Sequence, residues 1–92
     1  MNVPCLQRGF SRSDLVDLFA KRGSRRGAEI GVRQGAFASA LCRAMPDLEL
    51  LCVDPWLYYD TSPRQPSQAR QDANYRIAIE RLAPYRVRLD RR

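Results

Sequence analysis

The middle of the chain holds four residues whose types and spacing suit a nucleotide-like ligand: Glu29, Gly31, Gly35 and Asp54. Glycine directly after a strand lets the backbone turn sharply and approach a ligand, because no Cβ stands in the way. A helix that starts after Gly35 presents free amides at its amino end, and these form a polar rim for such a ligand. Asp54 follows a predicted strand, where a carboxylate can accept hydrogen bonds from both hydroxyls of a ribose. These residues therefore predict a cofactor-binding turn.

The spacing of the glycines separates the classes of nucleotide. Asp54 follows Gly35 at close to the roughly 20-residue distance of dinucleotide-binding folds. The pyrophosphate fingerprint, however, is Gly-x-Gly-x-x-Gly, whereas this turn reads Glu-x-Gly-x-x-x-Gly. Glu29 suits a positive group, such as the amino group of a methionine moiety, better than a pyrophosphate. A P-loop is excluded because no Gly-Lys-Ser/Thr follows the glycines.

The elements that must position these residues are predicted to follow one another as strand, glycine turn, helix and strand. Residues 28–32 form a short apolar run, and residues 36–45 contain strong helix formers. Residues 48–53 read as a buried strand, closed by Asp54 and Pro55. A strand, a crossover helix and a second strand form a βαβ unit, whose strands are parallel.

Further elements are predicted on either side of this unit. Ser11 or Ser13 can cap a helix that ends at Gly23, and Ser67 can cap another helix after a proline-rich loop. Residues 86–90 alternate between polar and apolar side chains, as a third strand would. The sequence therefore predicts an α/β fold of about three parallel strands with flanking helices.

Two segments resemble motifs of a known family. Residues 28–37, with Glu29-Ile-Gly-Val-Arg-Gln-Gly35 at their centre, look like motif I of class I S-adenosylmethionine-dependent methyltransferases. Residues 48–54, continued by Pro55 and Trp56, look like the end of their second strand. The amino-acid sequences of these two segments are similar to those of small bacterial and phage methyltransferases, and the resemblance covers roughly residues 26–89. It implies a truncated Rossmann-like three-layer sandwich.

The resemblance also implies a cofactor, S-adenosyl-L-methionine, and a role for each site residue. Glu29 would hold the methionine part of the cofactor, and Asp54 would bind the ribose hydroxyls. Gly31 and Gly35 would let the loop pass close to the cofactor. No metal is expected, since the family reaction is an in-line displacement at the sulfonium methyl, for which the protein mainly supplies proximity and orientation.

The family's sheet continues past its third strand into segments that supply acceptor-binding and catalytic groups, whereas this sequence stops at Arg92. We therefore expect residues 1–92 to be one partial domain that contains the cofactor-binding portion. The methyl acceptor and the catalytic residues are unassigned, and a completing chain or a homo-oligomer would be needed for transfer. Two alternatives stay open: a fragment of an NAD-type Rossmann oxidoreductase, and a small basic interaction protein without catalysis.

Composition narrows the partners. The net charge is +6, but the arginines are spread along the chain, which favours solvated helix faces over a nucleic-acid surface. No apolar run is long enough to span a membrane, and no secretory signal opens the chain, so a cytoplasmic protein without a membrane partner is expected. Histidine is absent, which argues against a Cys/His zinc site and excludes Ser-His or Cys-His catalysis within the chain. Cys42 and Cys52 are expected to be buried, and Cys5 has no CxxC partner.

Several neighbours of the motifs have two interpretations. The aromatic residues Trp56, Tyr58 and Tyr59 either line the adenine or acceptor side or cover the sheet edge. Arg33 and Gln34 lie within the glycine turn, where solvated side chains are favoured over contact with the cofactor carboxylate. Polar residues farther along the chain, among them Asn74, are expected to face solvent.

Overall fold

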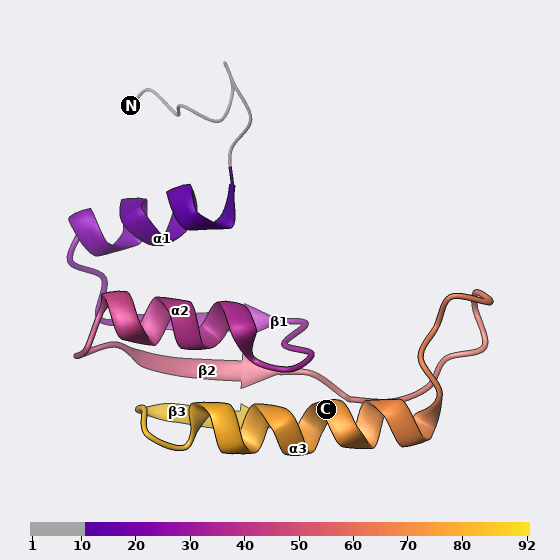
Figure 1. Ribbon diagram of the computed structural model, residues 1–92. Helices are drawn as coiled ribbons and strands as arrows, with labels where there is room; N and C mark the ends of the chain where they lie inside the picture. Colours follow the sequence, from indigo (N-terminus) through magenta and orange to yellow (C-terminus); the bar gives the residue numbers. More distant parts are fainter. Residues whose placement is uncertain (1–10) are drawn as a thin grey trace.

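The computed structural model describes residues 11–92, which form three helices and three strands in alternation (Figure 1). The expectations for residues 1–10, among them that for Cys5, lie outside this part. The elements are α1 (Arg12–Lys21), β1 (Arg26–Ile30), α2 (Ala36–Ala44), β2 (Glu49–Val53), α3 (Gln68–Leu82) and β3 (Val87–Asp90). The predicted order of strand, glycine turn, helix and strand over residues 28–53 is confirmed.

The three strands form one open sheet in the order β1-β2-β3, and both pairs are parallel. In the register, Glu29 lies beside Cys52, and Cys52 lies beside Leu89. Side chains alternate across a sheet, so these three share one face. That face carries the core, because Cys52 is fully buried.

The described residues form two layers, and the predicted three-layer sandwich is not formed within residues 11–92. Helices α2 and α3 lie on the same face of the sheet and contact each other (Figure 1). The reason is topological: β1, β2 and β3 follow one another in the same direction, and right-handed crossovers then place both connecting helices on one side. The opposite face exposes Ile30 (86%) and Leu51 (37%).

Helix starts follow the predicted serines. Ser11, not Ser13, caps α1: its hydroxyl accepts from the Asp14 N–H, and the Asp14 carboxylate accepts from the Ser11 N–H, which is a capping box. Ser67 caps α3 by accepting from the Arg70 N–H. The N-cap of α2 is Gly35, and no side chain there satisfies the first amides of the helix.

The core lies between the sheet and the helices α2 and α3. Its buried apolar residues include Ala38, Leu41, Cys42, Leu50, Cys52, Trp56, Ala78 and Leu82. The predicted burial of Cys42 and Cys52 is confirmed, and burial raises the pKa of Cys52 to about 12. Both thiols therefore act as small hydrophobic side chains. Within residues 11–92, no helix has the length and apolarity to cross a bilayer.

Candidate functional site

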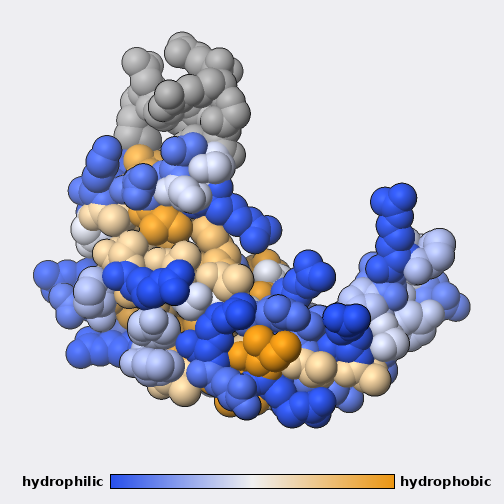
Figure 2. Space-filling model, viewed as in Figure 1, coloured by the Kyte–Doolittle hydropathy of each residue, from blue (hydrophilic) through white to orange (hydrophobic). Residues whose placement is uncertain are grey.

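The glycine turn between β1 and α2 lies at the carboxyl ends of the parallel strands, the edge at which open α/β sheets bind ligands. Three residues of this turn have positive φ: Gly31 (86°), Arg33 (57°) and Gly35 (77°). The Gly31 N–H donates to the Val53 carbonyl at 2.9 Å, which extends the β1–β2 ladder into the turn. Figure 2 shows the surface hollowed between the body of the protein and the loop that follows β2.

The two glycines face different surroundings. A Cβ at Gly31 would meet nothing within 4 Å, so the backbone there borders open space. A Cβ at Gly35 would lie 3.0 Å from the Leu82 Cδ1 and 3.6 Å from the Ala78 Cα. Gly35 thus allows the start of α2 to pack closely on α3, whereas Gly31 leaves room beside the turn.

Asp54 ties the glycine turn to the end of β2. Its Oδ2 accepts the N–H groups of Val32 at 2.8 Å and Arg33 at 3.0 Å, and its Oδ1 accepts the N–H of Trp56 at 2.8 Å. A carboxylate oxygen has about two acceptor positions, so Oδ2 is saturated and Oδ1 retains one. Among the described residues, Asp54 therefore keeps one acceptor position unoccupied, on Oδ1.

Glu29 has the opposite surroundings. Its Oε1 is buried and has no hydrogen-bond partner, alone among the buried side-chain oxygens and nitrogens of residues 11–92. Burial raises the pKa of Glu29 above the ordinary 4.5, the nearby Arg12 guanidinium opposes this rise, and the Asp54 carboxylate adds to it. An unpaired buried acceptor costs free energy, which a donor from outside the chain would recover.

Two adjoining cavities, each of about 430 Å³, flank the glycine turn and share Gly31 and Arg33 in their walls. The first is also lined by Glu29, by Arg12 from α1 and by Phe37. The second contains Asp54 together with residues of the 64–66 segment and α3. Cavities of this size suit small ligands and cofactors. Glu29 and Asp54 therefore line two neighbouring cavities, which meet at Gly31 and Arg33.

A larger cavity of about 660 Å³ lies at the opposite edge of the sheet. It is lined by the amino ends of the strands, including Arg26, Glu49 and Val87. We favour the two smaller cavities as the candidate ligand site. The carboxyl ends of the strands bring together the turn with positive φ angles, the unpartnered Glu29 Oε1 and a helix start without a side-chain cap.

Trp56 belongs to the scaffold of this site. It is fully buried and lines neither of the two cavities. Its indole Nε1–H donates to the Arg33 carbonyl at 2.7 Å, and its ring centroid lies 4.6 Å from that of Tyr75. Of the two interpretations of Trp56, the packing role describes its position, whereas Tyr58 and Tyr59 are about half exposed.

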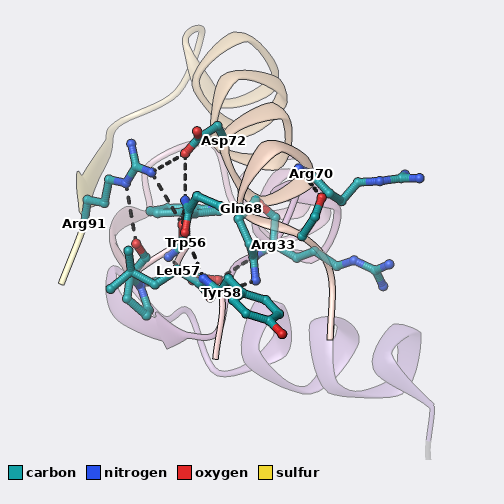
Figure 3. A network of polar contacts seen from close by, with 12 residues as sticks. Arg33, Trp56, Leu57, Tyr58, Gln68, Arg70, Asp72 and Arg91 are labelled. Atoms are coloured by element: carbon teal, nitrogen blue, oxygen red, sulfur yellow. Dashed lines mark hydrogen bonds and ion pairs between the residues drawn. The ribbon is translucent and has the colours of Figure 1, made fainter. Parts of the chain in front are cut away.

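A polar network fastens the segment after Asp54 to α3 and to the residue that follows β3 (Figure 3). The Gln68 side chain donates to the Trp56 carbonyl at 3.0 Å and accepts from the Tyr58 N–H at 2.9 Å. Arg91 pairs with Asp72 at 2.7 Å and also donates to the Trp56 carbonyl. Hydrogen bonds from Gln68 and Arg91 lower the pKa of Asp72. The network thus connects the segment after Asp54 to α3, the helix that contributes Gln71 and Asn74 to the Asp54 cavity.

Asn74 is the residue that the sequence interpretation placed wrongly. It was expected to face solvent, but only 2% of it is exposed, and it lines the Asp54 cavity. Its Oδ1 accepts from the Gln34 Nε2 at 3.0 Å, which holds the glycine turn against α3. The signal lies in the spacing: Asn74, Ala78 and Leu82 recur every four residues and so share the buried face of α3.

Residues 11–92 contain no group of three or more histidine, cysteine or acidic residues that could hold a metal ion. No model of a known protein family matches the chain, and no curated protein is found to be similar to it. The interpretation of the site therefore depends on its own residues. These are a turn with positive φ angles, the Asp54 carboxylate, which accepts three main-chain N–H groups, and the Glu29 carboxylate, whose buried Oε1 has no partner.

Proposed function

We propose that this chain binds S-adenosyl-L-methionine as the cofactor-binding portion of a class I methyltransferase. The observation that carries the proposal is the buried, unpartnered Oε1 of Glu29 in the wall of a cavity beside the glycine turn. The ammonium of the cofactor's methionine moiety would donate hydrogen bonds to this oxygen. A charge-assisted hydrogen bond of that kind is about twice as strong as a neutral one.

The division of the site into two cavities supports the same ligand. The methionine moiety would occupy the cavity of Glu29, and the nucleoside would occupy the cavity of Asp54. Gly31 lies between them and has no neighbour within 4 Å of the position of a Cβ, so the ligand could pass close to the backbone. The remaining acceptor position on the Asp54 Oδ1 would take one ribose hydroxyl.

The chemistry of such a site is mainly positional. The bound cofactor supplies a methyl group on a positive sulfur, which is a good leaving group, so the protein's own residues act by orientation and proximity. Glu29 and Asp54 would fix the two ends of the cofactor, and the turn around Gly31 would fix its middle. We assign no residue to the methyl acceptor, and transfer is proposed only in an assembly that supplies acceptor-binding groups.

Calorimetric titration with S-adenosylhomocysteine, with NAD as the control ligand, tests the proposal. We expect saturable binding of S-adenosylhomocysteine alone, because an ionised Glu29 beside the turn would repel a pyrophosphate. Glu29→Gln should weaken binding by about tenfold or more, since the charge-assisted bond is lost. Binding of NAD instead would favour an oxidoreductase fragment. Binding of neither, in protein whose fold is verified by circular dichroism, would reject the proposal in favour of an interaction protein.

A further inference from the structure

The cavity of Glu29 has a second charged wall that the motifs do not include. Arg12, the first residue of α1, lines this cavity together with residues of the glycine turn. Its guanidinium carbon lies 5.6 Å from the centroid of the Phe37 ring, which is within cation–π range. Among residues 11–92, no carboxylate is within ion-pair distance of this guanidinium.

Local structure holds Arg12 in this place. The capping box of Ser11 and Asp14 fixes the start of α1, and α1 packs on α2, the helix that carries Phe37. Arg12 is close enough for its charge to lower the pKa of Glu29, yet no ion pair joins the two side chains. The cavity thus presents an unpaired anion and an unpaired cation to the same space.

A ligand that satisfies both walls carries an ammonium and a carboxylate close together, as the zwitterion of an α-amino acid does. We propose that Arg12 binds the α-carboxylate of the cofactor's amino-acid end while Glu29 binds its ammonium. The planar guanidinium can donate two parallel hydrogen bonds to a carboxylate, which gives both strength and orientation. This inference rests on the proposed function and adds to it a specificity residue from α1, outside both motif-like segments.

Three nucleosides separate the contributions: S-adenosylhomocysteine, its decarboxylated analogue, which keeps the amine, and 5′-methylthioadenosine, which lacks the whole amino-acid end. We expect the full chain to bind S-adenosylhomocysteine at least about tenfold more tightly than the decarboxylated analogue, and 5′-methylthioadenosine more weakly still. Arg12→Met should remove the preference for the carboxylate, because it should weaken the binding of S-adenosylhomocysteine without weakening that of the decarboxylated analogue. Arg12→Lys should retain part of the preference, because lysine keeps the positive charge but lacks the two parallel N–H donors of the guanidinium.

Lys21→Met is the matched control, because it removes one positive charge from the exposed far end of the same helix. It should leave all three affinities unchanged. Equal affinity of the unaltered chain for S-adenosylhomocysteine and its decarboxylated analogue would overturn the role of Arg12 while leaving the proposed function intact. A preference that survives Arg12→Met would overturn it as well. Binding of none of the three nucleosides would reject the proposed function and this inference together.

Discussion

Glu29 and Asp54 lie at the carboxyl ends of neighbouring parallel strands, and the backbone satisfies only one of them. Asp54 accepts three main-chain N–H groups from two segments. Glu29, inside β1, turns an unpartnered oxygen toward the helix-covered face. Buried polar groups without a partner are rare and often mark functional positions. Asp54 is therefore already part of the scaffold of the turn, whereas Glu29 keeps an acceptor free, as the proposed function requires.

The largest effect is expected from Asp54→Ala. The substitution leaves the N–H groups of Val32, Arg33 and Trp56 without their acceptor and should lower the free energy of unfolding by about 3 kcal/mol. Urea denaturation followed by circular dichroism measures this change. Asp60→Ala, which removes an exposed carboxylate from the next loop, is the control and should cost less than about 0.5 kcal/mol. A cost for Asp54→Ala as small as that of the control would mean that the clamp contributes nothing.

This expectation changes how a ribose role can be tested. Loss of binding in Asp54→Ala cannot be assigned to the hydroxyl contact, since the same substitution loosens the turn. Comparing S-adenosylhomocysteine with its 2′-deoxy and 3′-deoxy forms on the unaltered chain avoids the problem. With one acceptor position left on the Asp54 Oδ1, one of the two deoxy forms should bind about as well as the parent.

Substitutions at Gly31 and Gly35 should change the stability less than Asp54→Ala does. They test the same distinction between a residue of the scaffold and a residue beside the ligand. Gly35→Ala combines a positive φ with a Cβ 3.0 Å from Leu82, and should cost about 2 kcal/mol. Gly31→Ala meets no neighbour and should cost about 1 kcal/mol from its backbone conformation alone. For affinity the order should reverse, because Gly31 borders both cavities and Gly35 borders neither. Thermal unfolding and titration with S-adenosylhomocysteine provide the two readouts. The same order in both would contradict the assignment.

The smallest change in the free energy of unfolding is expected from Glu29→Gln, and this substitution should stabilise the protein. The folded-state pKa of Glu29 is raised, so the folded protein holds this proton more tightly than the unfolded chain does. The unaltered protein should therefore lose stability as pH rises from about 4.5 through the folded-state pKa. Glu29→Gln should remove this loss and so stabilise the unliganded protein at pH 7, by less than the glycine substitutions destabilise it. Denaturation series at several pH values measure it. A variant with an unchanged pH profile would show that Glu29 ionises without cost.

The sequence was sufficient for the elements and their order because each carries a local signal. The serine caps, the glycine after α1, and the apolar run that becomes β2 are short-range features. The number of layers depends on the direction in which successive crossovers step along the sheet, and no local pattern encodes that direction. The exposure of Ile30 follows from this topology and not from its own neighbours in the sequence.

The candidate site, too, could be predicted only in part from the sequence. Spacing brought Glu29, Gly31 and Asp54 to one edge of the sheet, because the ends of parallel strands meet there. Spacing could not show that backbone amides already occupy most of Asp54, nor that Asn74 turns inward to bind Gln34. Arg12 reaches the cavity only because α1 packs on α2, a contact between segments with no shared motif.

The Asp54 clamp has a consequence for hydrogen exchange. Loop amides ordinarily exchange through small, independent openings. Here the amides of Val32, Arg33 and Trp56 belong to two loops but donate to a single side chain. They become free to exchange when that one carboxylate swings away, so their protection should rise and fall together. We therefore expect the turn before α2 and the segment after β2 to open and close together.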